Sequence, residues 1–227
     1  MSESAHAIGH RRRMIEAFNA ADGRGFHDYQ RLELLLFYAI PRRDVKPLAK
    51  ELLARFGSLR GVFTAEEAEL LAVPGVGPST ATLFRLIRTI LVSCLEENLR
   101  EKPHPSHKIV VEDYLRVNYG ASRNEELVIL LLDRHDRMIG ELRYPGGADS
   151  TQCDRRDVLR KILLRRQTAS VIAAHNHPDG NVCPSIRDIN ATRSLCALLN
   201  SVGIRLKDSL VVTADRCVSL MKYVPRR

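Results

Sequence analysis

The spacing of apolar positions divides the chain into a helical N-terminal part and a C-terminal part in which strands and helices alternate. Leu32, Leu35 and Leu36 recur at helical spacing and predict a helix over residues 28–39. Similar patterns and capping residues predict further N-terminal helices over 14–21, from Asp44 to 55, from Thr64 onward and over 79–99.

The C-terminal part contains apolar runs that are short enough to be strands. Residues 125–133 are apolar on both faces, which predicts an internal strand of a sheet. Residues 138–144, 169–174, 206–214 and 216–221 predict the other strands, with helices over 112–118, over 154–166 and after Ser185. We therefore expect an α+β protein with a helical domain at 1–100, a proline-bearing linker at 101–108 and a second domain at 109–227.

The strand at 169–174 runs into the most informative stretch of the chain, residues 175–188. His175 and His177 leave a strand on the same face, because side chains alternate along it. Pro184 and Ser185 predict a helix start that places Asp188 in the first turn, where it can reach back toward the histidines. Two histidines, one carboxylate and one open position match a catalytic zinc site. Ser185 and Asp188 also fit a capping box, and either histidine could be a hydrogen-bonded residue at a strand end.

The pattern His-x-His, seven residues, Ser, two residues, Asp resembles the JAMM signature of the JAB/MPN metallopeptidases. Its fuller form resembles the bacterial RadC-like branch, with Asp179 where that branch usually has Ser. The resemblance implies a cytidine-deaminase-like mixed sheet flanked by helices and one zinc ion per chain. It implies His175, His177 and Asp188 as ligands, Ser185 as a ligand-supporting or oxyanion-stabilising group, and a glutamate upstream as general base.

Four acids compete for the role of general base. JAMM enzymes place this glutamate where the first helix hands over to the first strand, which favours Glu125. Glu126 points to the opposite face, so the assignment depends on the register. Glu141 lies in mid-strand and is expected to face solvent, and Asp157 is expected to serve the helix dipole or to pair with Arg156 or Arg160.

A second motif lies at residues 73–78, Val-Pro-Gly-Val-Gly-Pro, before the long helix, and predicts a helix-hairpin-helix. The backbone amides of Gly75, Val76 and Gly77, with the following helix start, can hold a phosphate of DNA without reading its bases. Alternatively, the glycines only make a tight turn. The spacing of residues 49–57 before it resembles the N-terminal half of RadC-like proteins.

Charge, cysteine content and the length of apolar runs indicate which partners, disulfides and cellular location to expect. The formal net charge of +8 permits contact with nucleic acid. The basic side chains of the helix at 154–166 are expected to be a solvated surface or a groove for an acidic partner, and Arg11–Arg13 a solvated helix face or a phosphate contact. Five cysteines without a C-x-x-C pair make a disulfide framework unexpected. No apolar run has membrane-spanning length and no signal peptide is recognisable, so we expect a cytoplasmic protein.

The resulting expectation is a zinc-dependent hydrolase of a peptide or isopeptide bond, associated with DNA metabolism or repair. Two other classes of protein stay open: a DNA-binding metal-dependent nuclease, and a DNA-binding module whose metal site is not catalytic. Cys183 is a less favoured substitute ligand. The sequence predicts neither the oligomeric state nor the substrate.

Overall fold

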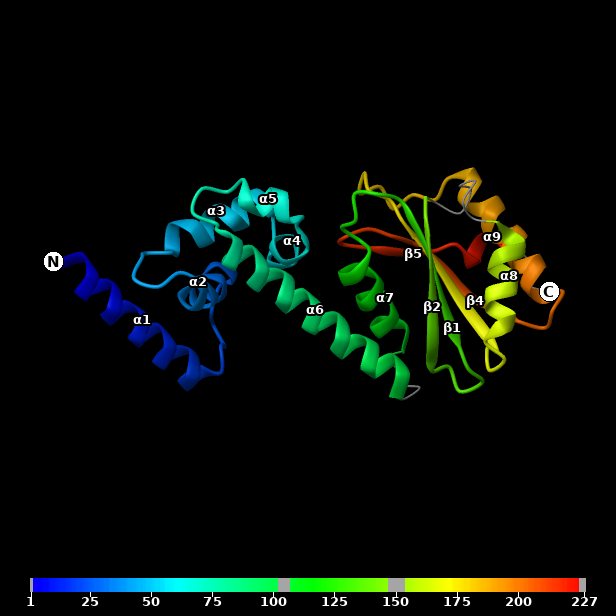
Figure 1. Ribbon diagram of the computed structural model, residues 1–227, viewed down its shortest axis with the longest axis horizontal. Helices are drawn as coiled ribbons and strands as arrows, with labels where there is room; N and C mark the ends of the chain where they lie inside the picture. The colour runs from blue at the N-terminus through cyan, green and yellow to red at the C-terminus, as the bar shows by residue number, and fades with distance from the viewer. Residues whose placement is uncertain (1, 102–106, 147–153, 225–227) are drawn as a thin grey trace. The chain divides into compact units, whose positions relative to one another are not determined.

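The computed structural model describes residues 2–101, 107–146 and 154–224 (Figure 1). It divides into two compact units, Met1–Ile90 and Leu91–Arg227. The division falls within the long helix α6, whose last turns belong to the second unit.

The first unit is helical. Its core is formed mainly by leucines and valines, together with Met14 and Phe84, and every helix of the unit contributes to it. Its helices are α1 (Ser2–Ala21), α2 (Asp28–Ala39), α3 (Lys46–Phe56), α4 (Leu59–Thr64), α5 (Glu67–Leu71) and the start of α6 (Pro78–Glu101).

Two expectations for this unit need correction. Thr64 does not cap a following helix; it ends α4, where its hydroxyl donates to the carbonyl of Arg60, and Glu66 caps α5. Arg11 is not a free basic side chain, because it donates to the carbonyl oxygen of Phe37 in the last turn of α2 and to those of Ile40 and Arg43 beyond it. Since helix ends leave carbonyls without intrahelical partners, Arg11 closes the C-terminus of α2 and does not remain free for phosphate.

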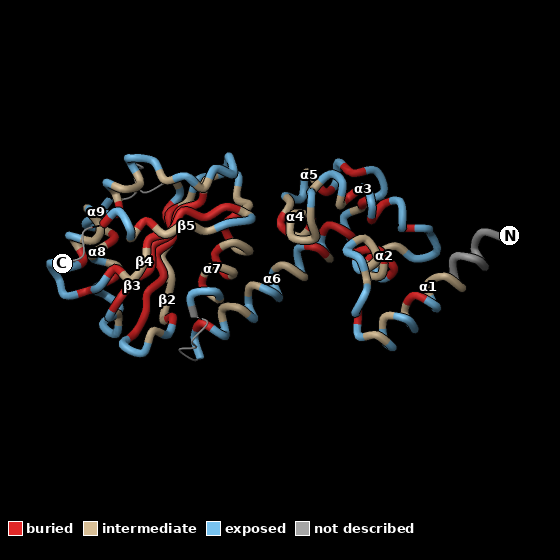
Figure 2. Tube along the Cα trace, turned by 180° about the vertical axis from the view of Figure 1, so that it is seen from behind, coloured by how far each residue is buried: buried red, intermediate tan, exposed pale blue. Residues whose placement is uncertain are grey.

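The second unit is built on a five-stranded mixed sheet in the order β2-β1-β3-β4-β5. β1 is antiparallel to β2 and β3, β3 is parallel to β4, and β4 is antiparallel to β5. The strands are β1 (Glu126–Leu132), β2 (Met138–Pro145), β3 (Ser170–Asn176), β4 (Arg205–Val212) and β5 (Cys217–Ser219). Because β1 and β3 are internal, they are buried almost throughout (Figure 2).

Helices cover both faces of the sheet (Figure 1). The end of α6 and α7 (His107–Asn118) pack on one face, with Leu99, Tyr114 and Leu115 in the core. α8 (Arg155–Leu164) and α9 (Ile186–Asn200) pack on the other, with Val158, Ile162 and Leu199 in the core. A 3-10 helix, η1 (Met221–Tyr223), follows β5. α6 runs to Glu101, two residues past the predicted end, and α7 starts at His107, before the predicted start at 112, so that Val111 is a buried position of this helix.

Two further findings concern the described residues as a whole. Cys94, Cys183, Cys196 and Cys217 are all free thiols. Across residues 2–101, 107–146 and 154–224, no helix combines the length and the apolar character needed to cross a membrane.

Candidate functional site

Two histidine rings converge at the end of β3. His175 is 3% exposed and lies beside Val211 of β4, while His177 follows the strand and donates its backbone N–H to the carbonyl of Val212. Their Nε2 atoms lie 3.1 Å apart. The expectation that both rings leave the sheet on one face is therefore met.

Asp188, in the first turn of α9, completes the group. Its Oδ1 lies 3.1 Å from His175 Nε2 and its Oδ2 lies 3.5 Å from His177 Nε2. With metal–ligand distances of about 2.0–2.1 Å, two ligand atoms of a tetrahedral zinc site stand roughly 3.3 Å apart. The three separations are close to that value, and these side chains are the group of potential metal ligands found among the described residues.

The chemistry of the donors also fits a metal ion. His177 Nδ1 lies 2.6 Å from the carbonyl oxygen of Asn181. Because a carbonyl only accepts, Nδ1 carries a hydrogen, and in the neutral ring Nε2 then presents its lone pair toward His175 and Asp188. Fixing the tautomer of a metal-binding histidine through its other nitrogen is a usual feature of such sites.

Ser185 and Asp188 form a capping box, which was one of the alternatives for this pair in the sequence. Asp188 also belongs to the group that it forms with the two histidines. Ser185 Oγ accepts from the Asp188 N–H at 3.2 Å, and Asp188 Oδ2 accepts from the Ser185 N–H at 2.7 Å. Burial opposes ionisation of the Asp188 carboxyl, but hydrogen bonds from His175 and Ser185 outweigh it and lower its pKa. The carboxyl is therefore ionised, as a metal ligand must be.

Asn176, between the two histidines, fastens the segment before β1 to the end of β3. Its side chain is almost fully buried and accepts from the Glu126 N–H at 2.7 Å. It also donates to the carbonyls of Ser122 and Asn124 at 3.1 and 3.0 Å. This role of Asn176 was not predicted from the sequence, although a buried amide at a strand end requires such partners.

The anchored segment carries Glu125 and Glu126. Leu127 is the cross-strand partner of His175, so both lie on the face covered by α8 and α9. Side chains alternate along a strand, so extending β1 by one residue assigns Glu125 to the same side of the sheet as Leu127 and His175. Glu126 lies on the α7 side beside Leu115 and Tyr119, and accepts from Ser122 Oγ at 2.9 Å. The Glu125 side chain is exposed and is not one of the three groups that converge.

The two remaining acids have other partners. Glu141 does not face solvent as expected: it accepts hydrogen bonds from Tyr114, Tyr119 and Arg143 on the α7 face. Burial, followed by these contacts with Glu141, raises the pKa of both tyrosines. Asp157 pairs with Arg160, as predicted, and with Lys161.

The thiol proposed as a substitute ligand is not part of the group. Cys183 is exposed, and its backbone N–H donates to the side chain of Asn181. It therefore belongs to the loop that orients His177.

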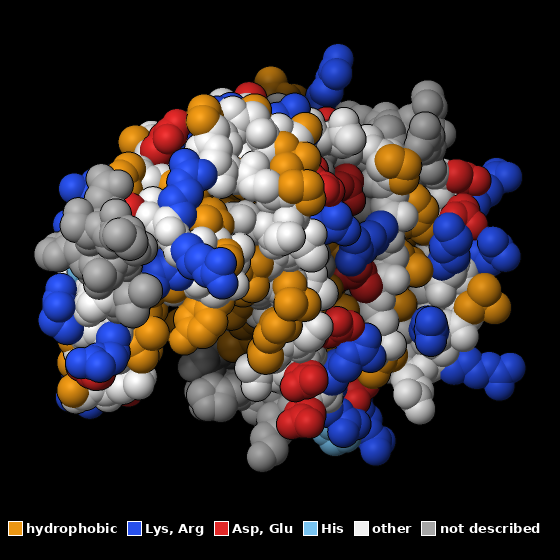
Figure 3. All heavy atoms as spheres, turned by 60° about the vertical axis from the view of Figure 1, so that its left-hand side comes forward, with side chains coloured by type: hydrophobic (Ala, Val, Ile, Leu, Met, Phe, Trp, Pro, Cys, Tyr) orange, Lys and Arg blue, Asp and Glu red, His pale blue; other side chains and the backbone are white. Residues whose placement is uncertain are grey.

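The hairpin between α5 and α6 also has a defined geometry. The Val76 N–H donates to the carbonyl of Val73 at 3.0 Å, so this predicted phosphate donor is used within the turn. Gly75 has a φ of +94°, and a Cβ there would meet the Arg43 guanidinium at 3.1 Å. A Cβ on Gly77 would meet nothing within 4 Å. Figure 3 shows many Lys and Arg side chains on the surface in view, with Asp and Glu side chains beside some of them.

Two stretches of the chain match known protein families. Residues 58–87 match the helix-hairpin-helix motif. Residues 106–224, more than half of the chain, match the RadC-like JAB domain. The convergence of His175, His177 and Asp188 at the end of β3 lies within the second match. The chain therefore belongs to the RadC-like JAB domain family and carries a helix-hairpin-helix in its N-terminal part.

Proposed function

We propose that this protein is a zinc-dependent hydrolase that cleaves a peptide or isopeptide bond. The observation that carries the proposal is the orientation of His177: its Nδ1–H is engaged by Asn181, so its Nε2 lone pair faces His175 and Asp188. Structural zinc sites have four protein ligands, whereas three with an open position are typical of catalysis.

The proposed roles follow from the position of each residue. His175, His177 and Asp188 hold one zinc ion per chain. When bound, zinc polarises a carbonyl and lowers the pKa of a water molecule to about 7. Glu125, which strand alternation assigns to the histidine side of the sheet, would serve as general base toward the attacking water and would return the proton to the leaving amine. The Ser185 hydroxyl accepts from the Asp188 amide and keeps its own hydrogen to donate to a developing oxyanion.

The experiment that tests this function is cleavage by the zinc-loaded full chain of a fluorogenic peptide library. Glu125→Gln and Asp188→Ala serve as paired variants. Cleavage should require zinc and should be lost in both. Activity that persists in Asp188→Ala, or no cleavage of any peptide or of a ubiquitin-like isopeptide, contradicts the proposal. Cleavage of DNA in parallel assays, with peptides untouched, would favour the nuclease instead.

We further propose that the hairpin contacts the DNA backbone, which would place the hydrolase near DNA and in DNA metabolism or repair. The specific support is the match of residues 58–87 together with the open space at Gly77. The amides of Gly75 and Gly77 are the donors in this proposal, because the Val76 N–H is used within the turn. Such contacts are independent of base sequence and sensitive to salt.

A further inference from the structure

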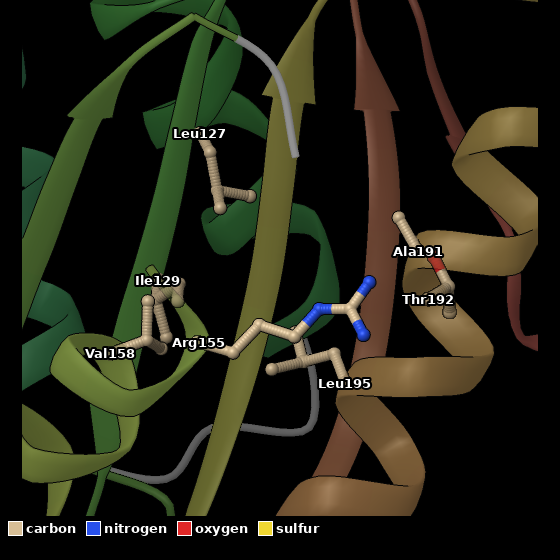
Figure 4. Close-up of a pocket in the computed structure, with 7 residues that line it drawn as sticks. All are labelled: Leu127, Ile129, Arg155, Val158, Ala191, Thr192 and Leu195. Atoms are coloured by element: carbon tan, nitrogen blue, oxygen red, sulfur yellow. The ribbon is translucent and has the colours of Figure 1, made fainter. Parts of the chain in front are cut away.

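A small apolar pocket lies between α8, β1 and α9, on the face of the sheet that carries His175. Its free volume is about 40 Å³. That is a few times the about 10–15 Å³ needed for one water molecule, so it suits a side chain of one to three carbons. The pocket is lined by Leu127, Ile129, Arg155, Val158, Ala191, Thr192 and Leu195 (Figure 4).

The pocket adjoins the metal centre through two of its walls. Leu127 is the cross-strand partner of His175, and their side chains lie on the same face. Ala191 and Thr192 follow Asp188 by three and four positions in α9, which places them one turn further along the same side of the helix. Opposed residues on a sheet and successive helical turns are about 5–6 Å apart. A group that enters the pocket is therefore roughly one residue away from the metal ligands.

Arg155 brings a positive charge to this pocket. Figure 4 shows its side chain extending from the start of α8 toward Ala191 and Thr192 of α9. Within the described part of the chain its guanidinium has no ion pair. The acids beside it are otherwise engaged: Asp154 caps α8, and Asp157 pairs with Arg160 and Lys161. The other lining side chains are apolar, apart from Thr192, whose hydroxyl lies 2.9 Å from that of Ser209.

We propose that the pocket binds the C-terminal residue of a peptide substrate. The small apolar side chain of that residue enters the pocket, and its terminal carboxylate pairs with Arg155. A guanidinium presents two parallel N–H groups that match a carboxylate. This inference rests on the proposed hydrolase function and assigns it a substrate class, namely peptides with a free C-terminus and a small last residue.

The position next to the metal centre favours a terminal carboxylate over an acidic side chain further along the substrate. In a terminal residue the side chain and the carboxylate share one Cα, so they reach the pocket and its arginine together. An acid in the following residue would stand a further ~3.3–3.6 Å along an extended chain. Hydrolysis in this pose breaks the C–N bond before the last residue. One water is consumed, a new carboxylate forms on the shortened peptide, and a free amino acid leaves with the proton on its amine.

Binding to the zinc-loaded full chain tests this inference without requiring turnover. The probes are N-acetyl-glycyl-alanine and its C-terminal amide, titrated into the Glu125→Gln variant by calorimetry or by NMR. The free acid should bind about tenfold or more tightly than the amide, because one charge-assisted contact is lost. Arg155→Gln should remove this preference, whereas Arg156→Gln, an exposed neighbour that does not line the pocket, should retain it.

A second variant tests the apolar part of the site. Ala191→Leu fills the pocket and should abolish binding of the alanine probe, with thermal unfolding recorded to show that the fold persists. Equal affinity for acid and amide, unchanged binding in Arg155→Gln, or no binding of either probe would overturn the inference. If the unsubstituted chain hydrolyses the acid and the amide equally well, the proposed hydrolase function holds and the inference about the pocket fails. If the acid binds selectively but no peptide is hydrolysed, the pocket binds a C-terminal residue as proposed and the hydrolase function is contradicted.

Discussion

The side chain of Asn176 accepts the backbone N–H of Glu126 at 2.7 Å, across 50 residues of sequence. The same amide donates to two carbonyls of the segment before β1. A residue that stands between the two histidines of the proposed metal site thereby fixes the segment that carries Glu125.

Replacing Asn176 should destabilise the protein. Asn176→Ala leaves the partner carbonyls of Ser122 and Asn124 and one N–H without their protein partner, which costs on the order of 1–3 kcal/mol for buried groups. The free energy of unfolding of the second unit, measured in urea, should fall by this amount. Asn190→Ala, at an exposed position of α9, should change it by less than about 0.5 kcal/mol. Equal values for the two variants would show that the anchor contributes nothing.

Glu125→Gln should retain zinc and lose hydrolysis, because the amide keeps the shape of the side chain but cannot take a proton. The matched control is Glu126→Gln, on the opposite face of β1, where the carboxylate accepts from Ser122. Single-turnover assays of both variants, with zinc measured on the same samples, separate loss of the base from loss of the metal. Full activity in Glu125→Gln would reassign the base.

Gly77→Val should weaken DNA binding and leave the fold intact, because a Cβ at this position meets no protein atom within 4 Å. Gly75 is a poorer probe, since its positive φ and the adjacent Arg43 would strain any substitution. Affinity for a short duplex, measured across a salt series, should drop for Gly77→Val and stay unchanged for Ala197→Val in the other unit. If both variants bind like the unsubstituted chain, the hairpin is only a turn.

Asp133 should make stability depend on acid pH. Burial opposes its ionisation, but hydrogen bonds from Arg137 and His135 lower the pKa of its carboxyl. A lowered pKa contributes stability above the unfolded value of about 3.9 that is lost as the pH falls through the folded value. Asp133→Asn should therefore lower the melting temperature at pH 7, and the difference should shrink below about pH 4. A constant difference from pH 7 to pH 3 would contradict this.

The sequence sufficed to predict the strands and the convergence of His175, His177 and Asp188, because both depend on local spacing. His175 and His177 need only the alternation of a strand, and Asp188 needs only a helix start. The partners of Glu141 could not be predicted, since Tyr114 and Tyr119 meet it only when α7 packs on the sheet. The same holds for Arg155, whose pocket depends on the packing of α8 and α9 across β1.

His175, His177 and Asp188 are proposed to bind one zinc ion. Zinc present at 100 times its dissociation constant should stabilise the folded protein by about 2.7 kcal/mol. Removing a ligand should abolish that stabilisation, whereas Cys183→Ser, which changes an exposed thiol outside the group, should leave it unchanged.

The most direct measurement is the zinc content of the purified full chain by mass spectrometry, for the unsubstituted protein, Cys183→Ser, Asp188→Ala and the double variant His175→Ala/His177→Ala. We predict about one zinc per chain in the first two. We predict little or none in Asp188→Ala and in the double variant. Near-full zinc occupancy in the double variant, or no zinc in the unsubstituted chain even after incubation with zinc, would contradict the assignment of this site.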